Sequence, residues 1–279
     1  MESLTEAQVT RSSASRRSVS WARCREELLP VFTRSETWRA LAAGDIRSKY
    51  RRTVLGPWWI TATNGITALI MGLVSGGFLG AEIKTYLPNF MVSVTIWNFI
   101  SSCLNESCFT LISAGGMIKA VNMPIIIHVM RMVHRNFIIL LHNMAIFPVL
   151  WLIFPWHVSL RLIFLVVGLA AIYLFAVAGS VIVSMICVRF RDVPPIVGSI
   201  LQVLFFISPI IWVPSQVRGG ALVVALNPIA YLLAVTRDPI MSNPVPLVDW
   251  IVAGGLVAAA LALAAFIYTR YRARIVFWA

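Results

Sequence analysis

Long apolar runs separated by short charged segments make up most of the chain. No charged residue occurs from 53 to 81, from 162 to 188 or from 193 to 217. A helix needs about 20 apolar residues to cross a bilayer, so each of these runs is long enough. Membrane β-barrels instead show alternating apolar and polar residues in segments of about 10. The pattern therefore predicts an all-α polytopic membrane protein.

The runs predict six transmembrane helices. We place these spans at about 57–81, 85–115, 136–154, 161–187, 195–214 and 250–269. Residues 33–52 come before the first span and carry apolar side chains at helical spacing, with most arginines on the other faces. This pattern is typical of an amphipathic helix lying in the membrane interface, although it also fits an ordinary charged flank before a span. The Arg- and Ser-rich residues 1–32 are expected to form a basic disordered arm.

Residues 219–236 are apolar but short, and Asn227-Pro228 interrupts them. Lys and Arg concentrate on the cytoplasmic side of membranes, and both ends of this chain are basic. Six spans place 19 of the 23 Lys and Arg residues on the cytoplasmic side and 4 outside, with both termini cytoplasmic. A seventh span would put the two basic ends on opposite sides. We therefore predict that 219–236 forms two short re-entrant helices at the outer face, between spans five and six.

Composition agrees with a membrane protein and argues against nucleic acid as a partner. The 279 residues are 59% hydrophobic and 12% charged, whereas soluble domains carry about 25% charged residues. The net charge of +12 gathers next to the spans, which favours anionic membrane lipids as the neighbour. The four cysteines show no spacing typical of a metal site or a disulfide framework.

No enzyme signature occurs in the chain. It contains no phosphate-binding Gly-x4-Gly-Lys loop, no HExxH and no dinucleotide fingerprint, so we expect a transport subunit that hydrolyses no ATP itself. Glu106 is the clear carboxylate within a span, and His142 lies in another. Glu106 could line a pore or act in gating, or could instead make a structural hydrogen bond to a neighbouring helix. Because one Glu and one His make a poor proton relay, we expect a partner to supply the energy.

Aromatic residues towards the outer side are candidates for lining a glycan conduit, since aromatic faces stack on sugar C–H surfaces. Packing or lipid-facing roles are the alternative for each of them. Together with Glu106, the conduit candidates are Trp97, Phe205, Phe206, Trp212 and Tyr231.

Four short motifs, taken together, carry a resemblance to a known family. Residues 50–59, YRRTVLGPWW, are similar to the YRRSxLGPLW sequence at the first span of ABC-2 type permeases that export polysaccharides. RFRDV at 189–193 resembles that family's turn between spans four and five. Asn227-Pro228 followed by Arg237 resembles its outer re-entrant segment, and ARIVFW at 273–278 its basic-aromatic tail. The resemblance covers roughly residues 35–279, and 33–279 would form the ABC-2 type transmembrane domain.

The resemblance implies a homodimer that works with two separate ABC ATPase subunits. Those subunits would bind ATP and Mg, and this chain would hold no cofactor of its own. The substrate would be a lipid-linked polysaccharide such as an O-antigen, moved from the cytoplasm across the bacterial inner membrane. The pore would form between the two permease copies.

The resemblance also implies where the ATPase and the substrate bind. Coupling to the ATPase would use the loop between spans two and three, with Lys119, Asn122, Met123, Pro124, Ile125, His128 and Arg131 as candidates. Family members often read aromatic-Pro-Arg-Glu there, whereas this chain keeps the proline and has its next positive charge at Arg131. The cytoplasmic mouth would use Tyr50, Arg51, Arg52, Arg189, Arg191 and Asp192.

Two functions are open for the basic residues of the mouth. Arg51 and Arg52 could attract the pyrophosphate of a lipid-linked substrate, because arginine favours bidentate phosphate contacts, or they could simply anchor the chain by the positive-inside rule. Asp192 could pair with a cytoplasmic arginine near residue 51, or the 189–192 elbow could be a topological anchor only.

Two rival functions for the whole protein also remain open at the level of sequence. One is an ABC-2 exporter of a drug or small lipid. The other is a channel or secondary transporter that needs no ATPase, although no internal repeat of the kind found in such transporters is visible.

Overall fold

Apolar α-helices account for nearly all of the chain that the computed structural model describes, namely residues 35–51, 53, 56, 58–79, 83–120, 124–214, 217 and 219–278. These residues contain no β-strand. The predicted arm 1–32 lies outside the described residues, as do Arg52, Asn122 and Met123. The prediction of an all-helical membrane protein is confirmed for the described part of the chain.

Four helical segments within these ranges are long and apolar enough to cross a membrane. They are α4 (Ile83–Ser113), α6 with α7 (Ile126–Met144 and Ile146–Ile153), η1 with α8 (Leu160–Ile163 and Phe164–Arg189), and Leu247–Arg272 of α12 (Leu247–Trp278). Two shorter apolar helices are Thr61–Val74, within α3 (Trp58–Leu79), and α9 (Val193–Ile207). By length and composition, four segments of the described chain could each cross a membrane, or five if the bent pair α10 and α11 counts as one span. The sequence predicts six spans, and this number stays a prediction.

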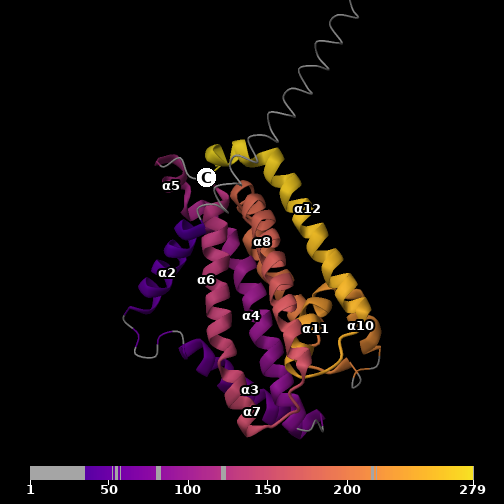
Figure 1. Ribbon diagram of the computed structural model, residues 1–279. Helices are drawn as coiled ribbons and strands as arrows, with labels where there is room; N and C mark the ends of the chain where they lie inside the picture. The colour runs from indigo at the N-terminus through magenta and orange to yellow at the C-terminus, as the bar shows by residue number, and fades with distance from the viewer. Residues whose placement is uncertain are drawn as a thin grey trace, which may run out of the picture.

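The long helices lie side by side in one bundle (Figure 1). α4 is central, since 72% of the residues in its apolar 18-residue stretch are buried, compared with 17% for the corresponding stretch of α12. α4 packs against both α6 and α8, and α12 lies along α8. α2 (Ser35–Tyr50) lies against the outer side of α6, and α5 (Gly115–Ala120) lies at the same end of the bundle as the C-terminal part of α12.

The chain bends sharply at Asn227, as the Asn-Pro pair predicts. α10 (Gly220–Leu226) and α11 (Pro228–Ile240) meet at 100°. The Asn227 side-chain oxygen accepts a hydrogen bond from the Ile229 amide at 3.0 Å, and Pro228 takes the first helical position, where no amide hydrogen is needed. Asn227 also donates to the hydroxyl of Ser208 at 2.8 Å, which ties the bend to the end of α9.

Several helix bounds differ from the predicted spans. α9 ends at Ile207 rather than near 214, because Pro209 lacks an amide hydrogen and disfavours helical geometry at Ser208. α12 extends to Trp278. α6 begins at Ile126, whereas the predicted third span begins at about 136, so residues 126–135 of the predicted loop between spans two and three are helical.

Candidate functional site

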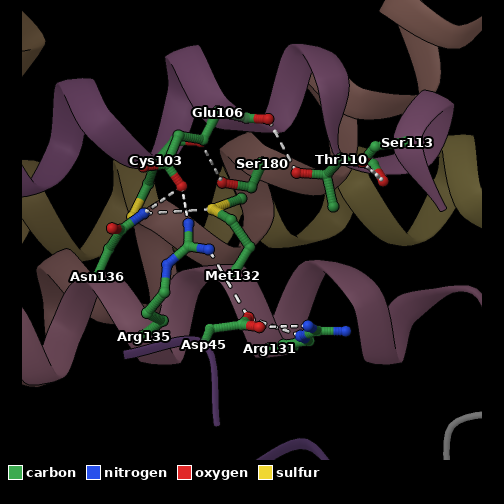
Figure 2. A network of polar contacts seen from close by, with 10 residues as sticks. All are labelled: Asp45, Cys103, Glu106, Thr110, Ser113, Arg131, Met132, Arg135, Asn136 and Ser180. Atoms are coloured by element: carbon green, nitrogen blue, oxygen red, sulfur yellow. Dashed lines mark hydrogen bonds and ion pairs between the residues drawn. The ribbon is translucent and has the colours of Figure 1, made fainter. Parts of the chain in front are cut away.

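A cluster of charged side chains joins α2, α4 and α6 (Figure 2). Arg131 on α6 donates through Nε to the Asp45 carboxylate on α2 at 2.6 Å, and its Nη2 bonds the second carboxylate oxygen. Arg135, one helical turn further, bonds the Glu106 carboxylate on α4 through Nη2. Its Nη1 lies 3.7 Å from Asp45 Oδ2. Arg135 therefore bridges the carboxylates of two helices.

The spacing of the two arginines makes this arrangement possible. Residues four apart lie on one face of a helix, so Arg131 and Arg135 both point from α6 toward the same space. Asn136, next along α6, donates to Glu106 Oε2 at 3.2 Å and so binds the same carboxylate. Glu106 thus accepts hydrogen bonds from a neighbouring helix, which was the structural alternative to a pore-lining role.

The four charged side chains are partly shielded from solvent, with exposed fractions between 19% and 36%. In such surroundings a charge without its partner costs far more than the complete pair contributes. The cluster therefore acts as a matched set that holds α2 at a defined position on α4 and α6.

A cavity of about 610 Å³ opens beside this cluster. Its lining comes from α2, α4, α6 and the segment between α4 and α5. The lining residues are Asp45, Lys49, Glu106, Phe109, Thr110, Ser113, Ala114, Met117, His128, Arg131, Met132 and Arg135. The rim holds two exposed apolar side chains, Phe109 at 58% and Met117 at 43%. The cavity thus combines a charged floor with an apolar edge.

Three nitrogen-bearing side chains of the cavity have polar atoms that no described residue binds. His128 is only 5% exposed and its Nε2 has no partner. The Nε of Arg135 is also buried without a partner. Lys49 is exposed at the rim and makes no ion pair with any residue that the structure describes. The cavity lining therefore carries three formal positive charges, from Lys49, Arg131 and Arg135, and two negative ones, from Asp45 and Glu106.

A smaller polar cavity of about 70 Å³ continues from the same charges toward the middle of the bundle. It shares Lys49 and Glu106 with the larger cavity and adds Asn98, Asn136 and Asn143. Asn98 donates to Asn64 at 3.2 Å, and Thr61 donates to Asn143, so α3 joins this polar seam. Polar residues inside membrane helices usually serve function, which makes the seam part of the candidate site.

The structure separates the residues predicted for the coupling loop. Lys119 belongs to α5, and Pro124 and Ile125 are half-buried just before α6. His128 and Arg131 belong to α6 and turn into the cavity, because the carboxylate of Asp45 offers Arg131 a partner inside the protein. Asn122 and Met123 lie outside the described residues.

The described residues of the predicted cytoplasmic mouth do not line the cavity. Arg51 is exposed at the end of α2, and Arg189, Arg191 and Asp192 are exposed at the turn between α8 and α9. Among the described residues, which include Arg51 but not Arg52, Asp192 makes no ion pair, so its pairing with Arg52 stays a hypothesis. Arg189 lies over the Phe190 ring at 5.7 Å.

Tyr50, the remaining described member of the predicted mouth, is half-buried at the end of α2. Its hydroxyl is buried without a hydrogen-bond partner among the residues that the structure describes. Burial raises the pKa of this phenol, so the side chain stays neutral.

Most of the predicted conduit aromatics lie together at the contact of α4 with α9. Trp97 is buried and its ring lies 5.9 Å from that of Phe205, which lies 5.4 Å from Phe206. Trp212 donates to the Phe206 carbonyl at 2.9 Å. Buried Trp97 packs inside the subunit, whereas Phe206 is exposed at 59%. Tyr231 lies apart from them and donates to the Ala225 carbonyl at 3.1 Å.

Sequence reasoning missed Asp45, Lys49 and Arg135 as site residues. One signal was available, since Asp45 is the only acidic residue between positions 37 and 81 and lies on a helix rich in arginine. The four-residue spacing of Arg131 and Arg135 was a second signal. It places the two side chains on the same helix face, but only if both residues are helical.

The bundle, the surface helix α2 and the charged cavity define a multi-pass helical membrane protein with a polar site near one end. The family model of the ABC-2 type transporter matches residues 36–241, which run from α2 to the end of α11. The chain therefore belongs to the ABC-2 type transporter family.

Two curated proteins are similar to this chain, over 202 and 203 residues. The O-antigen export system permease protein RfbA of Myxococcus xanthus is 24% identical over 202 residues, covering 70% of this chain and 76% of that protein. The protein of the same name from Klebsiella pneumoniae is 21% identical over 203 residues, covering 71% and 78%.

Proposed function

We propose that the protein is the permease subunit of an ATP-driven exporter that moves a lipid-linked, O-antigen-like polysaccharide out of the cytoplasm. The match to the ABC-2 type transporter family over α2 to α11 carries this proposal. The names of the two curated relatives supply the substrate class. The described residues hold no cluster of three or more metal-binding side chains, and ATP with Mg would bind the partner ATPase.

The working assembly would be two copies of this chain with two ABC ATPase subunits in a bacterial inner membrane. Residues 270–278 and α5 lie at one end of the bundle (Figure 1). That end carries Arg270, Arg272 and Arg274, so the positive-inside rule favours it as the cytoplasmic end. The N-terminus would be cytoplasmic as well.

In this assembly the ATPase would contact the segment between α4 and α6, at α5. α5 lies against α4 and α12, so a push on α5 would reach two membrane helices directly. The Asp45–Arg131 pair would then pass movement of α6 to α2 at the membrane surface. Export would follow from this rigid coupling rather than from proton transfer.

The bend at Asn227 would lie at the outer end of the assembly, where α10 and α11 would form the predicted re-entrant pair. Two hydrogen bonds link this pair to the end of α9. Asn227 donates to the Ser208 hydroxyl, and Arg237 of α11 donates to the Pro209 carbonyl. The exposed Phe206, close to that end, would face the conduit between the two permease copies.

Co-purification and ATPase stimulation test the proposal. We expect the tagged permease to isolate an ABC ATPase subunit from the native cell. The ATPase rate of that complex is expected to rise with lipid-linked glycan and to stay unchanged with small amphiphiles of similar charge. Stimulation by the small amphiphiles alone would contradict glycan export, and isolation of a permease without any ATPase would contradict ATP-driven transport.

A further inference from the structure

We propose that the cavity between α2, α4 and α6 binds the phosphate-bearing headgroup of a lipid. Lys49, His128 and Arg135 would donate to the phosphate oxygens. This proposal deepens the proposed function and rests on it, because the lipid carrier of the exported glycan would be the ligand. It moves substrate recognition away from Arg51, Arg189 and Arg191, which are exposed and do not line the cavity.

The strongest observation is the set of donors that the protein leaves unused. His128 is 95% buried, lines the cavity and has no partner for Nε2. Buried polar atoms nearly always have a hydrogen-bond partner, so an unpartnered nitrogen in a cavity wall points to a ligand. The Nε of Arg135, in the same wall, is likewise buried without a partner.

The charges of the cavity favour an anion. Asp45 already accepts hydrogen bonds from Nε and Nη2 of Arg131, and Glu106 accepts them from Arg135 and Asn136. Lys49 adds a positive charge that no carboxylate of the described chain neutralises. Phosphate oxygens can accept from ammonium, guanidinium and imidazole N–H groups, and such charge-assisted bonds are the strong ones.

The shape of the cavity fits a headgroup attached to an apolar chain. A volume of about 610 Å³ lies within the range of about 300–1,000 Å³ that small-molecule sites occupy. Thr110 and Ser113 add hydroxyl groups to the wall. Exposed Phe109 and Met117 lie at the rim, where they could contact the first carbons of a lipid tail. A free inorganic anion would gain nothing from that apolar rim.

Binding of a radiolabelled prenyl diphosphate to the full chain in lipid nanodiscs tests the site. Farnesyl diphosphate is the probe, and farnesol and inorganic pyrophosphate are the competitors. We expect farnesyl diphosphate to bind, inorganic pyrophosphate to compete more weakly and farnesol not to compete. Equal competition by farnesol would overturn phosphate recognition. Equal competition by inorganic pyrophosphate would overturn recognition of a lipid.

Two variants and a matched control locate the binding. Lys49→Gln and His128→Gln are each expected to weaken probe binding about tenfold, since one charge-assisted hydrogen bond to a phosphate oxygen is lost. Lys84→Gln removes the same charge at the opposite end of α4 and is expected to leave binding unchanged. Because Lys49 is exposed, its variant should fold even if the buried His128 variant does not. Unchanged binding by Lys49→Gln would overturn the proposal.

The readout separates this site from the proposed function. If the probe binds as expected but no glycan is exported, the headgroup site stands and the exporter proposal fails. If glycan export is normal in Lys49→Gln and probe binding is also normal, the exporter proposal stands and the site is overturned.

Discussion

Arg131 on α6 donates hydrogen bonds to both carboxylate oxygens of Asp45 on α2. Together with the ion pair between Asp45 and Arg135, this bidentate contact joins α2 to the membrane bundle by charge. Trp38, Ile127 and Met130 add an apolar contact between the same two helices. Movement of α6 must therefore carry α2 with it or break a partly shielded ion pair.

Breaking the Asp45–Arg131 pair is expected to loosen α2. Asp45→Asn should lower the free energy of unfolding by about 1–3 kcal/mol, because a partly buried guanidinium loses its charged partner. Reversible unfolding in mixed detergent micelles measures this change. Glu36→Gln is the matched control, since it removes an exposed carboxylate from the same helix and should change stability by less than about 0.5 kcal/mol. Equal effects of the two variants would show that the pair contributes nothing.

Glu106 and Arg135 are expected to be coupled energetically. In a double-mutant cycle with Glu106→Gln and Arg135→Gln, the double variant should be more stable than the sum of the single effects predicts. We expect an interaction energy of about 0.5–3 kcal/mol, since each single change leaves a charge without its partner. Asp45, 3.7 Å from Arg135, should limit the effect of Glu106→Gln. Additivity within about 0.3 kcal/mol would mean that the two side chains act independently.

The helical fold could be predicted because an uncharged apolar run of about 20 residues is what a helix needs to cross a bilayer. The Asn227-Pro228 break is similarly local, since asparagine caps a helix and proline starts one. The start of α6 could not be predicted in the same way. Arg131 and Arg135 looked like loop residues because an isolated charge is costly in a span, and only the packing of Asp45 and Glu106 against them removes that cost.

Gly168 allows α8 and α11 to approach closely. A Cβ atom at this position would lie 2.4 Å from the Val235 carbonyl oxygen, which is backbone and cannot rotate away. Gly168→Ala is expected to destabilise the protein by about 1–3 kcal/mol through overpacking. Gly254→Ala in α12 has open space around its Cβ and should be neutral or slightly stabilising. Comparison of the two unfolding curves checks this, and equal curves would mean that α8 and α11 pack less closely.

Asn227 is expected to hold the bend between α10 and α11. Asn227→Ala removes both the cap of α11 and the hydrogen bond to Ser208, so we expect a loss of about 1–2 kcal/mol. Exposed Asn243 provides the control, with Asn243→Ala expected to be close to neutral. Limited proteolysis next to the bend provides a second readout, because a loosened α10 should be cut faster. An unchanged cutting rate together with unchanged stability would contradict the capping role.

The candidate site was harder to predict than the fold because its residues come from three separate segments. Asp45, Glu106 and Arg135 are far apart in the sequence and lie together only when both α2 and α4 pack against α6. No short motif contains them. The aromatic candidates show the opposite case, since Trp97, Phe205 and Phe206 do lie together, but Trp97 packs inside the subunit and only Phe206 is well exposed.

ATP-dependent glycan movement in inverted membrane vesicles tests the proposed function most directly. The vesicles would carry the permease, its ATPase subunits and lipid-linked polysaccharide on the outward-facing cytoplasmic leaflet. Protection of the glycan from an added glycosidase measures its transfer into the lumen. We expect protection to increase with ATP and to stay at background with a non-hydrolysable analogue or without the permease. Protection that is equal with and without ATP, or that never rises although the ATPase hydrolyses ATP, would contradict ATP-driven polysaccharide export.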